Sequence, residues 1–211
     1  MRRRGVRLIV AVAAALLLAS GVAIAATLTC QTGSISTNPC KGTNSDDTLI
    51  GTLGDDYIIG GPTTHGYGDD IINGREGNDK LYGGYNDDTI TGNGGDDTVD
   101  GGYNRDTLDG GNGNDKIYGY YNRDKIIGGF GEDTISGGND DDNVDAADGE
   151  IDYINCGTGT DTLKADAYAD GTPLDKNADN TPLTNADNTP LNRSSSSCEN
   201  ITWVKPSSPS P

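Results

Sequence analysis

The sequence predicts an all-β fold in which copies of a nine-residue repeat stack into a parallel β-solenoid. Three observations support this prediction: the repeat runs from residue 42 to residue 164, one of its positions is always Asp, and another is always aliphatic. The copy at 110–118, GGNGNDKIY, defines the positions, with Gly110 at position one, Asp115 at position six and Ile117 at position eight. A nine-residue unit cannot enclose a core alone, but stacked units can.

Thirteen copies of the repeat can be aligned. They start at residues 42, 51, 65, 74, 83, 92, 101, 110, 119, 128, 137, 147 and 156, and the period is broken only by an insertion, GGPTT at 60–64, and by one alanine before 147. Position eight is Leu, Ile or Val throughout, which predicts one core-facing side chain per copy. Position six is Asp in every copy: Asp47, Asp56, Asp70, Asp79, Asp88, Asp97, Asp106, Asp115, Asp124, Asp133, Asp142, Asp152 and Asp161.

The residue types along one copy predict its local shape. Glycine at position one, and Gly or Asn at position four, favour a tight turn with left-handed backbone at those positions. Positions seven to nine, such as Lys-Ile-Tyr at 116–118, predict a three-residue strand whose central side chain alone faces inward. Each copy is therefore expected to be a six-residue turn and a short strand, with two copies forming one coil of eighteen residues.

The stacked aspartates predict a cation between the turns. Burial of one aliphatic side chain per nine residues offsets only a small part of the conformational entropy lost when that backbone is ordered. The aspartates within each file also repel one another, because they carry like charges. Carboxylate and carbonyl oxygens are hard ligands, which favour calcium over softer transition metals. The candidate ligands are the thirteen position-six aspartates and the carbonyls of the turns around Gly54, Gly77, Gly95, Gly113 and Gly131.

The repeat also resembles a known family. GGNGNDKIY at 110–118 and GGFGEDTIS at 128–136 are similar to the RTX, or hemolysin-type, calcium-binding nonapeptide G-G-x-G-x-D-x-U-x. The resemblance covers residues 42–164 and implies a right-handed parallel β-roll in which successive turns hold calcium between position-six carboxylates and turn carbonyls. The C-terminal part resembles secreted actinobacterial proteins of this type, because C-G-x-G-x-D at 156–161 is followed by Cys198-Glu199.

The two sides of the predicted coil differ in sequence. Copies starting at 51, 74, 92, 110 and 128 have Gly at position four, whereas those at 83, 101 and 119 have Asn preceded by Tyr. A spacing of eighteen places the tyrosines one above another, one strand spacing apart. We expect this file to stiffen one edge, and the alternative is a strip that binds a glycan or a surface; its members are Tyr67, Tyr85, Tyr103 and Tyr121.

Two cations distinguish the side that carries the tyrosines. Arg105 and Arg123 occupy position five, where other copies have mainly Asp, Asn or Glu. A positive charge beside a metal-binding turn opposes cation binding. We therefore expect weaker calcium sites on this side than on the side with glycine at position four.

The ends of the chain predict an exported protein. Four arginines, an apolar run and Ala23-Ile24-Ala25 have the layout of a secretory signal peptide at 1–25, with an uncleaved membrane anchor as the alternative. Four cysteines in an exported chain favour disulfides. Their spacings suggest the bridges Cys30–Cys40 and Cys156–Cys198, although three connectivities exist. Residues 26–41 are expected to form a disulfide-pinned cap, and 165–211 a low-complexity, largely disordered tail with a disulfide clip.

Charge and motif content exclude several functions. The formal net charge is −18, and removal of the leader leaves 11 basic and 33 acidic residues, a net charge of −22. Nucleic-acid binding is excluded because it needs a basic surface. No hydrolase or metalloprotease motif occurs, and the single histidine, His65, replaces a turn glycine. The sequence thus predicts a secreted, monomeric, non-enzymatic protein whose folding depends on calcium, without membrane attachment after leader cleavage. The alternative is an extracellular adhesion or glycan-binding module built on the same scaffold.

Overall fold

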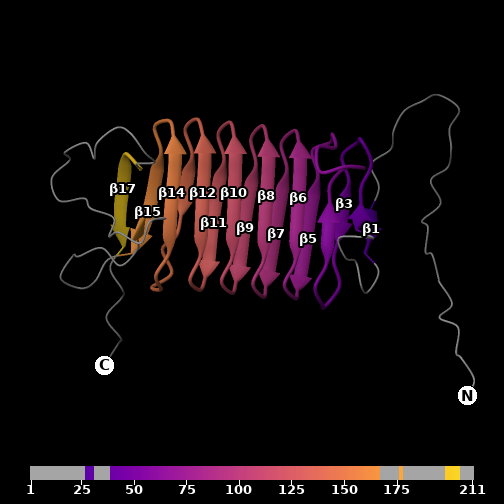
Figure 1. Cartoon of the computed structure of the whole chain (residues 1–211), viewed down its shortest axis with the longest axis horizontal. Coiled ribbons are helices and arrows are strands. Elements are labelled where there is room, and N and C mark those ends of the chain that lie inside the picture. The colour runs from indigo at the N-terminus through magenta and orange to yellow at the C-terminus, as the bar shows by residue number, and fades with distance from the viewer. Residues whose placement is uncertain (1–26, 31–38, 167–175, 178–197, 205–211) are drawn as a thin grey trace, which may run out of the picture.

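The chain winds into an elongated solenoid with two parallel β-sheets, whose strands run in opposite directions in the two sheets (Figure 1). The structure, a computed structural model, describes residues 27–30, 39–166, 176–177 and 198–204. The nine-stranded sheet contains β1 (Thr27–Thr29), β3 (Thr48–Ile50), β5 (Ile71–Glu76), β7 (Thr89–Gly94), β9 (Thr107–Asn112), β11 (Lys125–Phe130), β13 (Asn143–Asp145), β15 (Thr162–Asp166) and β17 (Asn200–Val204). The eight-stranded sheet contains β2 (Cys40–Lys41), β4 (Tyr57–Ile59), β6 (Lys80–Tyr85), β8 (Thr98–Tyr103), β10 (Lys116–Tyr121), β12 (Thr134–Asn139), β14 (Tyr153–Thr158) and β16 (Lys176–Asn177).

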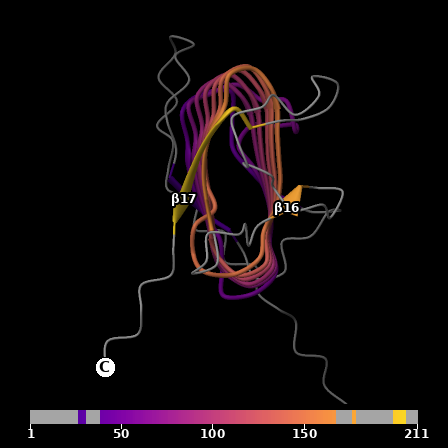
Figure 2. The same cartoon turned by 90° about the vertical axis from the view of Figure 1, so that its left-hand side faces the viewer.

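The core is a single row of aliphatic side chains from each sheet. Figure 2 looks along the solenoid and shows each coil as a flattened loop, with one sheet on each long side. The position-eight side chains fill the narrow space between the sheets, and none of them is more than 1% exposed. The predicted all-β solenoid and its core-facing position are confirmed.

The eighteen-residue period sets the register of both sheets. Ile117 pairs with Val99 on one side and with Ile135 on the other, so equivalent positions stack directly. Across the insertion at 60–64 the spacing grows to 23 residues, as in the pair Leu49 and Ile72, yet position eight still meets position eight. The insertion is therefore accommodated outside the sheets, and the stack continues.

Most strands are longer than the sequence predicted. Strand β10, for example, has six residues and continues from Lys116 through the next copy's first three positions to Tyr121. The expectation of six-residue turns and three-residue strands was wrong, because positions two and three of each copy also pair with the coils above and below. Only positions four to six lie between such strands.

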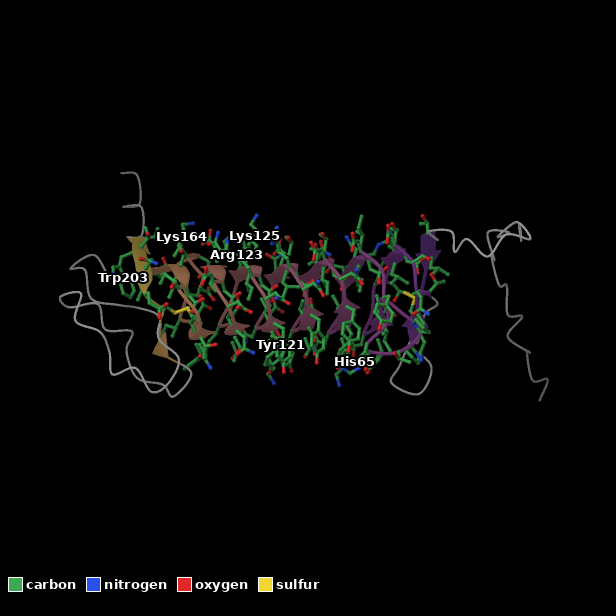
Figure 3. All side chains as sticks on the ribbon, turned by 90° about the horizontal axis from the view of Figure 1, so that it is seen from above. His65, Tyr121, Arg123, Lys125, Lys164 and Trp203 are labelled. Atoms are coloured by element: carbon green, nitrogen blue, oxygen red, sulfur yellow. A yellow bond between two sulfur atoms is a disulfide. The ribbon has the colours of Figure 1, made fainter. Side chains whose placement is uncertain are left out.

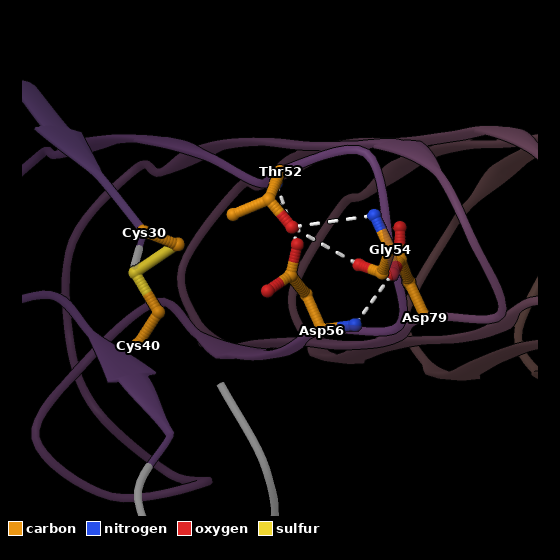
Figure 4. The surroundings of a disulfide bond; sticks show 6 residues. All are labelled: Cys30, Cys40, Thr52, Gly54, Asp56 and Asp79. Atoms are coloured by element: carbon orange, nitrogen blue, oxygen red, sulfur yellow. Dashed lines mark hydrogen bonds between the residues drawn. A yellow bond between two sulfur atoms is a disulfide. The ribbon is translucent and has the colours of Figure 1, made fainter. Parts of the chain in front are cut away.

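Both ends of the solenoid add strands outside the repeat region. Strand β1 pairs with β3, β2 pairs with β4, and β17 pairs with β15 over five residues. The disulfides Cys30–Cys40 and Cys156–Cys198 lie at these ends, and Figure 4 shows the first of them beside the turn that contains Asp56. The spacings had suggested this pairing from among the three connectivities.

Some expectations concern residues outside the described ranges. The leader at 1–25 and most of the tail at 165–211 lie there; the described tail residues belong to β15, β16 and β17. Within the described part of the chain, no helix has the length and apolar character that crossing a membrane requires.

Candidate metal centre

The thirteen position-six aspartates lie in two files, one along each edge of the solenoid. Turns that lead into the nine-stranded sheet carry seven of them, and we call this the asparagine edge after Asn86, Asn104 and Asn122. Turns that lead into the eight-stranded sheet carry the other six, and we call this the glycine edge after Gly54, Gly77, Gly95, Gly113 and Gly131. All thirteen aspartates are at most 3% exposed.

Each file is joined by a continuous set of hydrogen bonds, the inner ladder. The main-chain N–H of Asp97 donates to Oδ1 of Asp115 at 2.8 Å, and the N–H of Asp115 donates to Oδ1 of Asp133 at 2.8 Å. The same bond recurs on the other edge, as from Asp88 to Asp106. The position-six side chain thus reaches one coil back and accepts a main-chain hydrogen bond there, a role that Asp fills along both files.

The second carboxylate oxygen has no partner in most of these residues. Among the described residues, Oδ2 is buried without a hydrogen bond in Asp70, Asp79, Asp88, Asp97, Asp106, Asp115, Asp124, Asp133, Asp142 and Asp161. A buried charged oxygen without a partner is costly, and its recurrence at equivalent positions calls for a common explanation. A cation between the turns is such an explanation.

Glycine at position one is needed for space and not for a left-handed backbone. The φ angle of Gly110 is not positive, whereas positions two and four are left-handed, as at Gly111 and Gly113. A Cβ at Gly110 would clash with Oδ2 of Asp115 and with the carbonyl oxygen of Gly128 one coil on. The left-handed assignment of position one was therefore wrong. These two oxygens converge beside the Gly110 Cα because no side chain fills that space.

Burial and mutual repulsion raise the pKa values of the position-six carboxyls. Desolvation is the main cause, and it raises the pKa of Asp115 to about 6, of Asp97 to about 7 and of Asp106 to about 9. The hydrogen bond from the neighbouring main chain opposes this rise, while the negative charges of adjacent aspartates add to it. A bound cation would offset both unfavourable contributions.

These residues fit calcium if main-chain oxygens complete its ligand set. Among the described residues, no three His, Cys, Asp or Glu side chains converge closely enough to hold a metal by themselves. Carboxylate oxygens lie next to main-chain carbonyl oxygens, as at Asp115 in its turn and Gly128 in strand β11. Calcium takes six to eight oxygen ligands of both kinds in flexible geometry, so this donor set suits it.

A second set of hydrogen bonds, the outer ladder, joins the position-five residues. Here the side chain of the earlier coil accepts: Oδ1 of Asp96 receives the N–H of Asn114, and Oδ1 of Asn114 receives the N–H of Glu132, both at 2.9 Å. The two ladders therefore run in opposite directions along the glycine edge.

The outer ladder of the asparagine edge includes the two arginines. The Arg105 N–H donates to Oδ1 of Asp87 at 3.0 Å. The side chain of Arg123 forms an ion pair with Asp141, one coil further on, at 2.8 Å. The Arg123 cation is thus paired with an exposed acid of the outer ladder.

Comparison with known families agrees with this geometry. The profile of the RTX calcium-binding nonapeptide repeat (4 copies) matches residues 41–62, 66–99, 91–120, 100–135 and 118–150. These ranges together cover half of the chain. The chain belongs to the RTX family of calcium-binding nonapeptide repeats. No curated protein and no solved structure matches it.

The repeat pattern did not predict one member of the asparagine edge, Glu199. Oε2 of Glu199 accepts the N–H of Asp161 at 2.8 Å, so this glutamate takes the place of position six in a further coil. Asn200 pairs with Thr162, and Ile201 pairs with Leu163, which places Ile201 at position eight. The order acid, polar, aliphatic at 199–201 was the signal that could have revealed this coil.

Proposed function

We propose that this protein is a secreted, non-enzymatic calcium-binding protein whose repeats fold when calcium binds between the stacked turns. The observation that carries the proposal is the row of buried position-six carboxylates with unpartnered oxygens. The ligands would be the thirteen position-six aspartates together with the turn carbonyls, including those around Gly54, Gly77, Gly95, Gly113 and Gly131.

The same observation supports the coupling of folding to calcium. Without a cation, folding must bury like charges in two files, and this opposes folding. An ion that binds the folded chain and has little affinity for the unfolded chain stabilises the fold in proportion to its binding free energy. Calcium would then supply the stability that the narrow aliphatic core does not.

Secretion is supported by the sequence and by the cysteines. The leader pattern at 1–25 and the two disulfides both fit an oxidising, extracytoplasmic compartment. Calcium is abundant in many extracellular environments, so the protein would order after export. The sequence contains no hydrolase or metalloprotease motif, and the repeat accounts for the turn carboxylates as cation ligands better than as catalytic pairs.

The alternative, a glycan-binding strip on the tyrosine file, gains little support. The rings of Tyr85 and Tyr103 stack with centroids 4.6 Å apart, as do those of Tyr103 and Tyr121. Tyr67 continues the file at 5.1 Å. Inner rings that are covered on both faces cannot stack on a sugar, so the file fits the predicted stiffening role better.

Isothermal titration of calcium into the mature protein tests the proposed ligands. We expect Asp115→Asn to weaken or remove the sites on either side of its turn, with about tenfold lower affinity there. Asp109→Asn is the matched control, because it removes the same charge from position nine of the neighbouring copy. If both variants titrate like the unmodified protein, the aspartate files are not the calcium ligands.

A further inference from the structure

A hollow of about 350 Å³ lies on the outer face of the eight-stranded sheet, away from the position-six turns. Its base is formed by Gly84 and Gly102, which pair with each other in β6 and β8. Because both residues lack a side chain, a gap opens between position nine, represented by Tyr82 and Asp100, and position three, represented by Tyr103.

Two departures from the repeat close the ends of this gap. At one end, Thr64 belongs to the insertion 60–64 and His65 follows it; the His65 ring lies 5.9 Å from the ring of Tyr85. At the other end, Tyr120 continues the row of Gly84 and Gly102. Figure 3 shows His65 and Tyr121 on one face of the solenoid, opposite Lys125 and Lys164.

The Tyr120 backbone is unusual for a bulky residue. Its φ angle is 77°, at a position where Gly102 and Gly138 occupy the neighbouring coils with φ of 109° and 122°. A left-handed conformation costs a bulky L-residue about 1–2 kcal/mol relative to glycine. Such strain is often found where a side chain serves a functional site.

The hollow contains a carboxylate without a matching cation. Asp100 lies between Tyr82 and Tyr118 in the position-nine column. Among the described residues it forms no hydrogen bond or ion pair, and no Lys or Arg lines the hollow. Burial raises the pKa of Asp100 to about 6, and the nearby His65 lowers it slightly. A cationic ligand would compensate this desolvated charge.

Aromatic rings surround the same carboxylate. Tyr82 pairs with Tyr57 at 5.2 Å, and Tyr120 pairs with Tyr118 at 5.8 Å, and neither of these partner rings lines the hollow. Tyr82 and Tyr120 both lie close enough to Asp100 for its negative charge to contribute to the raised pKa of each phenol. Tyrosine rings attract ammonium groups through their π-electrons, with about 0.5–2 kcal/mol per favourable contact.

We propose that this hollow binds an alkylammonium group, with Asp100 as its counter-ion and the tyrosine rings as its walls. An anion would be repelled by Asp100 and by the chain's net charge of −18. A hydroxyl group of a neutral sugar could donate a hydrogen bond to Asp100, but the sugar would leave this half-buried charge uncompensated. The ammonium group could belong to a free small molecule or to a lysine side chain of another protein.

Titration calorimetry and saturation-transfer NMR on the mature protein, at saturating calcium, test this inference. The probes are choline, its uncharged isostere dimethylbutanol, acetyl-lysine methylamide and cellobiose. We expect choline or the lysine derivative to bind at least about tenfold more tightly than dimethylbutanol. Tighter binding of choline would indicate a small-molecule ligand, and tighter binding of the lysine derivative would indicate a protein side chain.

Three variants distinguish effects on ligand binding in the hollow from effects on the stability of the scaffold. Asp100→Asn should abolish the preference for the charged probe, whereas Asp109→Asn, at position nine on the opposite sheet, should retain it. Tyr120→Gly should bind the probe about fivefold or more weakly, yet keep or raise the thermal midpoint, because glycine suits the left-handed position. A merely structural role for Tyr120 predicts a lower midpoint instead.

The inference is overturned if the folded protein binds neither ammonium probe, or binds cellobiose more tightly than both. It is also overturned if Asp100→Asn binds choline as well as the unmodified protein does. Circular dichroism of each sample establishes that the sheets are formed. The hollow uses none of the position-six aspartates. Absence of ammonium binding by a folded chain would therefore leave the calcium proposal intact.

Discussion

At the scale of single residues, the position-six aspartate combines two tasks. In Asp115, Oδ1 accepts the main-chain N–H of Asp97 and fixes the register of adjacent coils, while Oδ2 is buried without a partner. Gly110 leaves the space that Oδ2 occupies. The same residue types that build the turn thus also keep an oxygen available for a cation.

Substitution of Gly110 tests this crowding. Gly110→Ala should lower the free energy of unfolding by about 1–3 kcal/mol in calcium, because its Cβ would clash with Asp115 and with the Gly128 carbonyl. Gly54→Ala is the control, since nothing lies within 4 Å of a Cβ there. Thermal unfolding of both variants checks this, and equal midpoints would contradict the crowding.

The raised pKa values predict how pH affects the calcium-free protein. The folded-state pKa of Asp88 is raised to about 8 and that of Asp106 to about 9, above their ordinary value of 3.8. Protonation therefore favours folding, and this stability is lost as pH rises from about 4 through about 9. Calcium-depleted protein should show more β-structure by circular dichroism at about pH 5 than at about pH 8. More structure at the higher pH would oppose this account.

The residue-scale pattern was only partly predictable from sequence. Position six could be recognised because it is Asp in all thirteen copies. The roles of the glycines could not be separated, because glycine is chosen both for left-handed backbone, as at Gly111, and for missing volume, as at Gly110. The sequence alone shows that glycine is present at a position, but it does not show which of these two requirements the glycine meets.

At the scale of elements, the stacking of coils arranges equivalent side chains in columns. Position eight supplies the core column, and Tyr67, Tyr85, Tyr103 and Tyr121 supply an aromatic column along the eight-stranded sheet. The eighteen-residue spacing predicted the aromatic column, and the structure confirms it. The spacing did not predict six-residue strands, because positions two and three have no hydrophobic pattern that indicates pairing.

Truncation within the tyrosine file tests its stiffening role. Tyr103→Ala removes a ring that stacks on both Tyr85 and Tyr121, and should cost about 1–3 kcal/mol of unfolding free energy at about 0.5–1.5 per ring pair. Tyr121→Ala, at the end of the file, should cost about half as much. Chemical denaturation in calcium measures both, and a larger loss for Tyr121→Ala would contradict the stacking account.

At the scale of the whole molecule, the solenoid is closed by segments that the repeat pattern does not include. Strand β17 and Glu199 extend one sheet and one aspartate file, and the Cys156–Cys198 disulfide ties them to the stack. The coils of the repeat region could be predicted from the sequence because each coil repeats the pattern of the one before. The final coil could not be recognised in this way, because Glu199 lies 38 positions after Asp161 in the sequence and only three residues of the pattern survive.

The central claim is that calcium supplies the stability that the folded chain needs. Its most direct test is far-ultraviolet circular dichroism of the mature, disulfide-bonded protein at neutral pH during a calcium titration, with magnesium as the control. We predict a disordered spectrum in chelator and a cooperative gain of β-sheet signal with calcium but not with magnesium. A full β-sheet signal that is already present in chelator would contradict the claim.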